Sequence, residues 1–394
     1  MKTINLIENL DDSYGGPAKS VPYMCKYLND IGVNTEILSI KYHDNEVNSV
    51  VDEYNLDWKS FNYDFIKKFR YSKNLKVYLE QELQKRDDII LHTHNLWNYI
   101  PLVAYIKSIK YNIPLLSTIR GSAQLDKLQK KIVWYLFQKK ILNYSNIVHV
   151  TKIEDIALLR NMGIKSKIAY IPNGINIDEF KTLKDKQKSK ESLNLDLNKK
   201  YILFMSRLHP KKGLEYLVNS WIKLANKYKE WDLLIVGPEY DKTYVENIKN
   251  SIKKANLENR VTFTGMLKDQ DRIDSFGASD LFVLPSHTEN FGIAIAEAMA
   301  AKLPIITTKG TPWEEIEKYN AGWWVELNQE NIDKALENAL SLKEYELIQK
   351  GLNGFELIKK YEWKYQAKKM KELYEYILNG GDKPKFVYEY NDKI

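Results

Sequence analysis

The chain has 394 residues, of which 44% are hydrophobic and 28% are charged, and its formal net charge is +7. This length suits two α/β domains better than one, and the hydrophobic content excludes a largely disordered chain. The single cysteine, Cys25, excludes an internal disulfide framework and a zinc site that is built from several cysteines.

The first half of the chain alternates short β-like runs with helical runs, which predicts a parallel sheet covered by helices. No element is assigned to 43–73, where aromatic and charged residues follow no clear period. Helices are expected at 18–31 and 102–110, and strands are expected at 3–7, 34–40, 88–92, 114–119, 146–150 and 167–171.

A polar, lysine-rich stretch at 181–200 then predicts a linker. A second α/β series follows, helices finish the chain from about 331, and the residues from 380 onward are expected to be frayed. The strands of this second series are expected at 201–206, 232–236, 260–264, 281–284, 304–307 and 322–325.

These elements predict two Rossmann-like domains, an N-terminal one over 1–180 and a C-terminal one over 181–362. A helix at about 363–379 is expected to pack back on the first domain. Two doubly wound sheets that face each other would bind ligands in the cleft between them, because the carboxyl ends of both sets of strands point there. Functional side chains are therefore expected in the loops that follow strands.

The most informative segment runs from 285 to 308 and contains two glutamates, Glu289 and Glu297. A helix is favoured over 294–301, so Glu289 would lie in the loop before it and Glu297 about one turn inside it. Free backbone amides at the helix start, 291–293, suit phosphate or sugar oxygens, and Glu297 can accept two hydrogen bonds from a ribose diol. The alternative is an ordinary loop charge and a solvated helix residue.

A second cluster follows the first strand of the second half, at 206–213. Arg207 would emerge at the end of that strand, and Lys212 would lie just before the next helix. Two fixed cations suit a diphosphate leaving group, whose negative charge grows as the glycosidic bond breaks. A basic surface loop is the alternative.

At these residues the chain resembles retaining glycosyltransferases of family 4, which have the GT-B fold. Two later runs, GTPWEEI at 310–316 and AGWWV at 321–325, are similar to a bacterial surface-polysaccharide branch of that family. The resemblance covers nearly the whole chain, and its ordered motifs are Gly15-Gly16-Pro17, PNGI at 172–175, SRLHPKKG at 206–213 and the paired glutamates.

The resemblance implies a role for each matching residue. Arg207 and Lys212 would hold the donor diphosphate, and Glu289 would bind the donor sugar. The other implied donor-binding residues are Glu297 at the ribose hydroxyls, the amides of Phe291, Gly292 and Ile293, and Gly15 and Gly16, where only glycine lets the first loop approach closely. A plain turn is the alternative for the glycine pair.

Three further polar residues follow strands of the first half. Branch members often carry a histidine before Gly-Leu-Trp, and here His94 precedes Asn-Leu-Trp, so a ligand or catalytic role is expected for His94. An ordinary structural histidine is the alternative, and His92 is expected to be buried. Many members place His-Gly after the next strand, whereas this chain has Arg120-Gly121, so Arg120 is expected to grip an acceptor phosphate or hydroxyl.

No metal site is predicted. Asp269-Gln270-Asp271 is similar to the metal-binding Asp-any-Asp of other glycosyltransferases, but it precedes a helix, where Asp269 would serve as an N-cap. The resemblance implies metal-independent catalysis, with Arg207 and Lys212 in place of the cation. No cofactor is implied beyond a UDP- or GDP-linked donor.

A basic amphipathic stretch at 126–144 allows two interpretations. It is either an ordinary helix with a solvated basic face or a surface that docks on an anionic membrane. Nucleic-acid binding is not expected, because no recognised binding module accompanies the charge. No run approaches the roughly 20 apolar residues of a transmembrane helix, and the N-terminus does not match a signal peptide, which predicts a cytoplasmic protein.

The sequence therefore predicts transfer of a sugar from a nucleoside diphosphate to a hydroxyl of a glycan or lipid-linked glycan, in polysaccharide or lipopolysaccharide synthesis. No obvious carboxylate nucleophile is present, so front-face attack with retention is favoured over double displacement. The alternatives are a sugar phosphorylase, a nucleotide-sugar epimerase, or a non-enzymatic scaffold at the membrane surface. A dehydrogenase is disfavoured, because the first loop lacks Gly-any-Gly-any-any-Gly.

Overall fold

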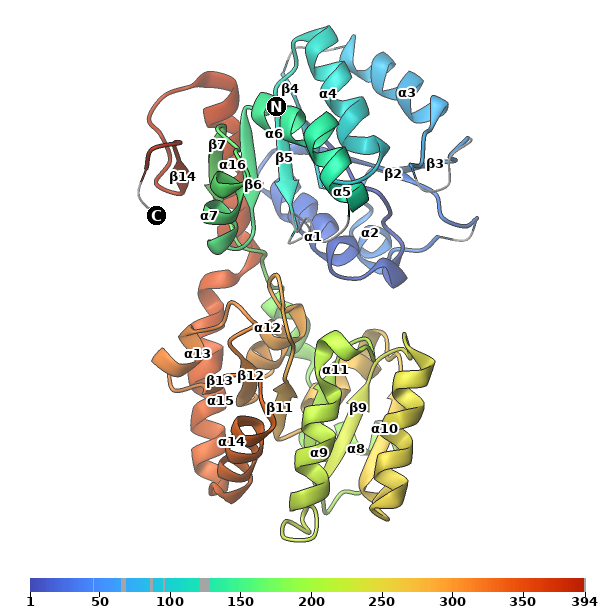
Figure 1. Ribbon diagram of the computed structural model, residues 1–394, viewed down its shortest axis with the longest axis vertical. Coiled ribbons are helices and arrows are strands. Elements are labelled where there is room, and N and C mark those ends of the chain that lie inside the picture. Colours follow the sequence, from blue (N-terminus) through green and yellow to red (C-terminus); the bar gives the residue numbers. More distant parts are fainter. Residues whose placement is uncertain (45, 65–68, 86–87, 95, 121–127, 393–394) are drawn as a thin grey trace. The chain divides into compact units, whose positions relative to one another are not determined.

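The computed structural model describes residues 1–394 apart from 45, 65–68, 86–87, 95, 121–127 and 393–394. It divides into two compact units (Figure 1). Unit 1 consists of Met1–Gly174 and Trp363–Ile394, and unit 2 consists of Ile175–Glu362. None of the described helices is long and apolar enough to cross a bilayer.

Unit 1 is built on an eight-stranded sheet with the order β14-β7-β6-β5-β4-β1-β2-β3. All neighbouring strands are parallel except β14, which is antiparallel to β7. The strands are β1 (Lys2–Leu6), β2 (Asn34–Ile40), β3 (Trp58–Phe61), β4 (Ile89–Thr93), β5 (Leu115–Ile119), β6 (Ile147–Val150), β7 (Lys167–Tyr170) and β14 (Val387–Tyr388).

Helices cover both faces of this sheet. Ile90 belongs to the apolar cluster under α1 and α16, whereas its neighbours Ile89 and Leu91 belong to the cluster under α3 and α4. Successive strand residues point to opposite faces, so the two clusters are the two sides of one sheet. The helices are α1 (Gly16–Asp30), α2 (Ser49–Tyr54), α3 (Lys73–Leu83), α4 (Tyr99–Tyr111), α5 (Leu128–Val133), α6 (Lys139–Tyr144), α7 (Glu154–Asn161) and α16 (Trp363–Asn379).

Unit 2 is built on a six-stranded, fully parallel sheet with the order β10-β9-β8-β11-β12-β13. Its strands are β8 (Lys200–Met205), β9 (Trp231–Val236), β10 (Val261–Gly265), β11 (Leu281–Leu284), β12 (Ile305–Thr308) and β13 (Gly322–Val325). Its helices are α8 (Lys186–Ser192), α9 (Leu214–Leu224), α10 (Lys242–Lys254), α11 (Asp269–Gly277), α12 (Ile293–Ala300), α13 (Glu315–Lys318), α14 (Gln329–Ser341) and α15 (Glu344–Ile358).

Several details differ from the sequence expectation. The first unit ends at Gly174 rather than at 180, because Ile175 and Phe180 are buried in the core of unit 2. The stretch expected as a linker contains α8, and the stretch left unassigned contains α2 and β3. The end expected to be frayed contains β14, whose Val387 is buried beside β7.

The helix expected at 363–379 is α16, which packs in unit 1 rather than in the unit that precedes it in the chain. Trp363, Leu373 and Tyr374 are buried in the same apolar cluster as residues of α1. The chain therefore passes between the units twice, after Gly174 and after Glu362.

In both sheets the strand order reverses once. In unit 2 the strands β9 and β10 lie on one side of β8, and β11, β12 and β13 lie on the other. In unit 1 the order reverses between β1 and β4. Ligands of doubly wound sheets bind outside the carboxyl ends of the strands at such a reversal. The loops after β8 and β11, and those after β1 and β4, are therefore the places to look for function.

Candidate functional site

Backbone contacts lock together the two loops at the reversal in unit 2. The amide of His287, after β11, donates to the carbonyl of Lys211, after β8, at 2.9 Å. Gly213 has φ 66°, and a Cβ there would lie 2.0 Å from the carbonyl oxygen of Pro285. Only glycine satisfies both constraints, so the SRLHPKKG run has a structural reason to end in glycine.

Lys212 and Glu289 meet across these loops. Lys212 Nζ lies 2.5 Å from Glu289 Oε1, and the two side chains are 16% and 12% exposed. The structure thus brings together a cation and a carboxylate that the sequence assigned to one ligand. A partly buried ion pair holds both groups in place but leaves them accessible at the surface of the unit.

Arg207 lies on the same loop as Lys212, just beyond β8, and its side chain is exposed. Its guanidinium carbon is 5.3 Å from the ring centroid of Tyr240. Among the residues that the structure describes, no carboxylate forms an ion pair with it. Arg207 is therefore a cation at the reversal point whose charge remains available to a ligand.

Glu297 is buried inside α12, at 4% exposure. Its Oε1 lies 2.9 Å from Nη1 of Arg272 on α11, and Arg272 also pairs with Glu179. Neither Arg272 nor Glu179 was singled out from the sequence. They belong to segments distant from Glu297 in sequence, and only the fold, in which α11 and α12 both contact the 177–182 turn, reveals the network.

A glycine and a pair of packed aromatic residues shape the start of α12 and leave its first backbone amide uncapped. Gly292 caps the helix with φ 78°, and no side chain caps it, so Ile293 begins the helix with its amide group available. Phe291 is buried, and its ring lies 5.1 Å from Trp313. Trp313 also donates through Nε1 to the carbonyl of Phe291. The GTPW run thus supports the loop between Glu289 and Glu297.

Asp269 does not serve as the predicted N-cap. Lys268 occupies that position in an extended conformation, and α11 begins at Asp269 itself, which has φ 46°. The aspartate side chain therefore points from the first helical residue and makes no capping bond. Within the described ranges, His, Cys, Asp and Glu form no group of three or more that could hold a metal ion.

In unit 1, the glycine pair lies at the start of α1. Gly15 has φ 99° and precedes the helix, and Gly16 is the first helical residue. A Cβ at Gly15 would meet nothing within 4 Å, so its backbone conformation rather than crowding requires glycine. The open space in front of it remains compatible with a ligand.

His92 lies in β4 and His94 directly follows that strand, and both histidines are buried. His92 contacts the Tyr374 hydroxyl at 2.8 Å through Nδ1 and the Thr118 hydroxyl at 2.5 Å through Nε2. His94 contacts Asn5 Oδ1 at 3.1 Å through Nε2. Burial lowers the pKa of both imidazoles well below 6.5, so both are neutral at pH 7.

Arg120 lies beside His94, directly after β5. Its Nη2 is 3.3 Å from His94 Nδ1, and its Nη1 donates to Ser20 Oγ at 2.7 Å and to Asn173 Oδ1 at 3.1 Å. The structure therefore joins Arg120, the predicted acceptor-side residue, and His94, which was predicted to have a ligand or catalytic role, into one cluster. Asn173 belongs to the PNGI run, which gives that run a contact with the cluster. The neighbouring positions 95 and 121–127 lie outside the described residues.

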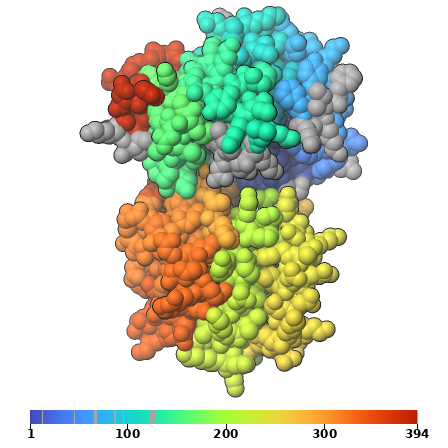
Figure 2. Space-filling model, in the orientation of Figure 1, coloured from blue at the N-terminus to red at the C-terminus, as the bar shows by residue number. Residues whose placement is uncertain are grey.

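The basic stretch predicted at 126–144 is described from residue 128 onward; positions 126 and 127 lie outside the described residues. It forms α5, a π-helical turn over Trp134–Gln138, and α6. Figure 2 shows this blue-green segment at the surface of unit 1. Its exposed large hydrophobic side chains are Leu128, Ile132, Tyr135, Leu136, Phe137 and Tyr144, of which Tyr135 is 71% and Leu136 is 61% exposed.

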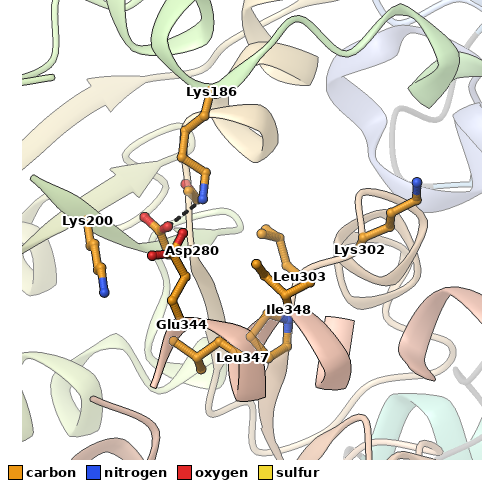
Figure 3. A pocket seen from close by; sticks show the side chains of 10 residues that line it. Lys186, Lys200, Asp280, Lys302, Leu303, Glu344, Leu347 and Ile348 are labelled. Carbon is orange, nitrogen blue, oxygen red and sulfur yellow. Dashed lines mark hydrogen bonds and ion pairs between the residues drawn. The ribbon is translucent and has the colours of Figure 1, made fainter. Parts of the chain in front are cut away.

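A pocket in unit 2 lies at the opposite edge of the sheet from the candidate site (Figure 3). It is lined by residues at the amino ends of strands, among them Lys200, Asp280 and Pro304. Lys186 lines it too, but its Nζ is paired with Asp280 Oδ1 at 2.5 Å. The pocket therefore plays no part in the strand-end chemistry described above.

Two family models match the chain. "Glycosyltransferase Family 4" matches residues 14–179, and "Glycosyl transferases group 1" matches residues 185–353. Together they span both units. The chain also resembles solved structures over nearly its full length. A sucrose-phosphate synthase from Thermosynechococcus elongatus superposes with a TM-score of 0.80 at 20% identity and covers 97% of this chain and 100% of that one.

A second solved structure, the Anabaena protein HepE in complex with UDP-glucose, has a TM-score of 0.77 at 17% identity, with 95% of this chain and 99% of that chain covered. Among curated proteins, the mannosylfructose-phosphate synthase of Agrobacterium fabrum is 32% identical over 41% of this chain and 37% of that protein.

The lipopolysaccharide core mannosyltransferase LpsB of Rhizobium meliloti is 29% identical over 41% of this chain and 47% of that protein. The match thus covers less than half the length of each of these two relatives. An uncharacterized glycosyltransferase of Methanocaldococcus jannaschii is 28% identical over 92% of this chain and 94% of its own length. With both units matched in order and the same architecture in solved structures, the chain belongs to the family 4 glycosyltransferases and has the GT-B fold.

Proposed function

We propose that this glycosyltransferase transfers a sugar from a nucleoside diphosphate to an acceptor hydroxyl with retention of the anomeric configuration. The observation that carries the proposal is the contact between Lys212 and Glu289 at 2.5 Å. In a nucleotide sugar, the β-phosphate is bonded directly to the anomeric carbon. A cation for the phosphate and a carboxylate for the sugar hydroxyls must therefore be neighbours, as these two are.

The rest of the donor site is proposed around that pair. Arg207 adds a second cation for the diphosphate, and the start of α12 offers backbone amides at 291–293. Glu297 is proposed to accept hydrogen bonds from the ribose hydroxyls. The complexes of HepE with UDP and with UDP-glucose support a nucleotide-sugar donor. UDP or GDP is proposed as its carrier.

The proposed mechanism is front-face attack. As the bond between the anomeric carbon and the phosphate oxygen breaks, Arg207 and Lys212 stabilise the negative charge on the departing diphosphate. That phosphate oxygen takes the proton of the acceptor hydroxyl, whose oxygen forms the new bond on the same face of the sugar. Because the two side chains supply the positive charge, the reaction is proposed to need no metal ion.

The acceptor is proposed to be a glycan or lipid-linked glycan of polysaccharide or lipopolysaccharide synthesis. The name of LpsB and its similarity to this chain support that class. The exposed apolar segment 128–144 supports a peripheral contact with the inner face of the cell membrane, because its lysines suit anionic lipids. The mannosylfructose-phosphate synthase of Agrobacterium fabrum is named for a sugar phosphate, which supports an acceptor that carries phosphate.

The test is to incubate the full chain with UDP- and GDP-linked sugars and a lipid extract, without metal. Nucleoside diphosphate release that depends on the extract, with product of unchanged anomeric configuration by NMR, is expected. Cleavage that requires inorganic phosphate would identify a phosphorylase instead, and donor conversion without extract would identify an epimerase. Arg207→Ala is expected to lower kcat more than it raises the donor KM.

A further inference from the structure

Arg120 carries a guanidinium whose partners among the described residues are all neutral. They are the Ser20 hydroxyl, the Asn173 amide oxygen and the His94 imidazole. Its Nε is buried and has no hydrogen-bond acceptor. Among the described residues, no carboxylate forms an ion pair with it. The five N–H groups of this side chain are thus only partly used.

Three other arginines in the described part of the chain, all buried or half-buried, have carboxylate partners. Arg70 lies 3.5 Å from a Glu8 carboxylate oxygen, and Arg260 pairs with Asp232. Arg272 pairs with two glutamates. A desolvated cation without a counter-charge costs several kcal/mol in the free protein. Arg160 has no carboxylate partner either, but it donates to the backbone carbonyls of Ile164, Ser166 and Tyr388. Arg120 has neither a carboxylate nor a set of carbonyls among the described residues, and folding stability does not explain its position.

The described residues around Arg120 supply no negative charge at neutral pH. The Cys25 thiol acts electrostatically on Arg120, but burial raises the pKa of that thiol to about 12, so the thiol is neutral. Packing around the guanidinium lowers the pKa of Arg120 to about 10, so Arg120 itself stays protonated at pH 7. Its side chain keeps some exposure to solvent, which leaves a path for a ligand.

The contacts of His94 fix the direction of the guanidinium. Asn5 Oδ1 can only accept, so His94 Nε2 carries the proton and Nδ1 accepts from Arg120 Nη2. A neutral His94 orients the guanidinium without neutralising it. Ser20 and Asn173 hold Nη1 in the same way from α1 and from the PNGI run. The cluster therefore positions a positive charge and does not neutralise it.

We infer that Arg120 is the centre of an anion-binding site in unit 1, which receives a phosphate or carboxylate group of the acceptor. This inference rests on the proposed function, since it specifies the acceptor of the same reaction. The planar fork of Arg120 suits bidentate binding of such oxyanions, and an incoming anion would supply the counter-charge that the protein omits. His94 is, in this arrangement, a positioning residue that acts through Arg120.

The first test uses Arg120→Met in the full chain, with Arg160→Met as the matched control. Arg160 is also in unit 1, but it donates to the carbonyls of Ile164 and Ser166. Without ligand, Arg120→Met is expected to keep or raise the Tm, because an uncompensated charge is removed, whereas Arg160→Met is expected to lower it. A clear loss of Tm in Arg120→Met would show a structural arginine and overturn the inference.

The second test measures anion binding with the donor site filled by a saturating concentration of UDP or GDP, whichever of the two stabilises the parent. Inorganic phosphate, against chloride at equal ionic strength, is expected to raise the Tm of the parent and of Arg160→Met by up to a few degrees. Arg120→Met is expected to show no such shift, and Arg120→Lys a reduced one. A phosphate shift that is equal in Arg120→Met, or absent from the parent, would overturn the inference.

Two further probes distinguish the source of the anion and the failure of the wider proposal. Glucose 6-phosphate and a short-chain phosphatidic acid are compared under the same conditions. A shift with the first alone supports a soluble sugar phosphate, and a shift with the second alone supports a lipid-linked acceptor. If neither UDP nor GDP stabilises the parent, the donor proposal fails. If the nucleotide binds but Arg120→Met loses none of the Tm shifts that the anions produce, only the inference at Arg120 fails.

Discussion

Lys212 Nζ and Glu289 Oε1 lie 2.5 Å apart and join the loop after β8 to the loop after β11. Both groups belong to the proposed donor site, so in the free enzyme each binds the other instead of a ligand. A donor must replace this contact with two of its own, from Lys212 to phosphate and from Glu289 to sugar. Until a ligand with both groups arrives, Lys212 and Glu289 thus neutralise each other, and the charge of Arg207 remains available.

Glu289→Gln is the variant that separates these two contacts. It removes the charge that holds Lys212 and keeps the size of the side chain. We expect the variant to bind UDP or GDP at least as tightly as the parent, because Lys212 no longer has to leave a carboxylate. Turnover should fall by about 10²–10³, because a transition-state contact is lost. Calorimetry and initial rates measure the two effects.

Asp280→Asn is the matched control for that variant, since Lys186 and Asp280 also lie 2.5 Å apart but at the other edge of the sheet. It should change neither UDP affinity nor turnover. If Glu289→Gln weakens UDP binding as much as Lys212→Met does, the proposed exchange of partners is wrong.

Arg272 is predicted to be a positioning residue for the donor, because it holds Glu297 at 2.9 Å and is itself held by Glu179. Arg272→Met should raise the donor KM about tenfold, equivalent to about 1.4 kcal/mol, and leave kcat less affected. Arg272→Lys should recover part of the loss. Arg260→Met breaks a comparable pair with Asp232 and should alter stability alone. An unchanged KM in Arg272→Met would contradict this role.

Three buried histidines, His92, His94 and His149, predict a pH dependence of the stability of unit 1. Burial lowers the pKa of His149 to about 3 and those of His92 and His94 well below 6.5. The unfolded chain, with histidine pKa near 6.5, then binds more protons than the folded chain below pH 6.5. Stability should be full above pH 6.5 and should fall as the pH decreases from there.

The slope of that fall is limited to about 1.4 kcal/mol per pH unit for each histidine. The loss of stability is measured as the change in the urea midpoint for unfolding of unit 1 between pH 7.5 and pH 5.5. His149→Gln should reduce the slope, because one titrating group is removed while the amide can replace the hydrogen bonds to Thr118 and Ile171. A midpoint that does not change over this range would show that the histidine pKa values are not lowered in the folded chain.

The strands were predictable because each is a short apolar run bounded by polar residues. The run at 34–40 coincides with β2, and the run at 281–284 coincides with β11. A strand such as β14 has only two residues and no period, so its place beside β7 depends on tertiary packing. The same holds for the boundary after Gly174, which burial of Ile175 and Phe180 in unit 2 decides.

The candidate site was predictable residue by residue but not as a network. Strand-end position singles out Lys212 and Glu289, since parallel strands bring their carboxyl ends to one edge. Nothing in the sequence links Glu297 to Arg272, because no local spacing relates α12 to α11. The neutral surroundings of Arg120 were equally hidden, since Ser20 and Asn173 come from two distant segments.

The exposed segment 128–144 predicts binding to anionic membranes. Lys131, Lys139 and Lys140 accompany its apolar side chains, and no carboxylate in the described chain forms an ion pair with these three. Each lysine near an anionic surface contributes about 1 kcal/mol. The chain should cosediment with vesicles that contain phosphatidylglycerol, less so at high salt, and weakly with pure phosphatidylcholine.

Leu136→Asp should abolish that cosedimentation, because it places a charge among the exposed apolar side chains. Ile348→Asp, at a comparably exposed isoleucine of α15 in unit 2, is the control and should bind as the parent does. Equal cosedimentation of Leu136→Asp and the parent would contradict a membrane contact through this segment.

The most direct test of the donor site is the thermal shift produced by UDP and by GDP, without metal and with NAD as the control. At about 100 times its dissociation constant, the correct nucleotide should stabilise the chain by about 2.7 kcal/mol, or a few degrees. Glu297→Ala should abolish the shift. No shift with either nucleotide, or a shift with NAD alone, would contradict the donor site at Arg207, Lys212, Glu289 and Glu297.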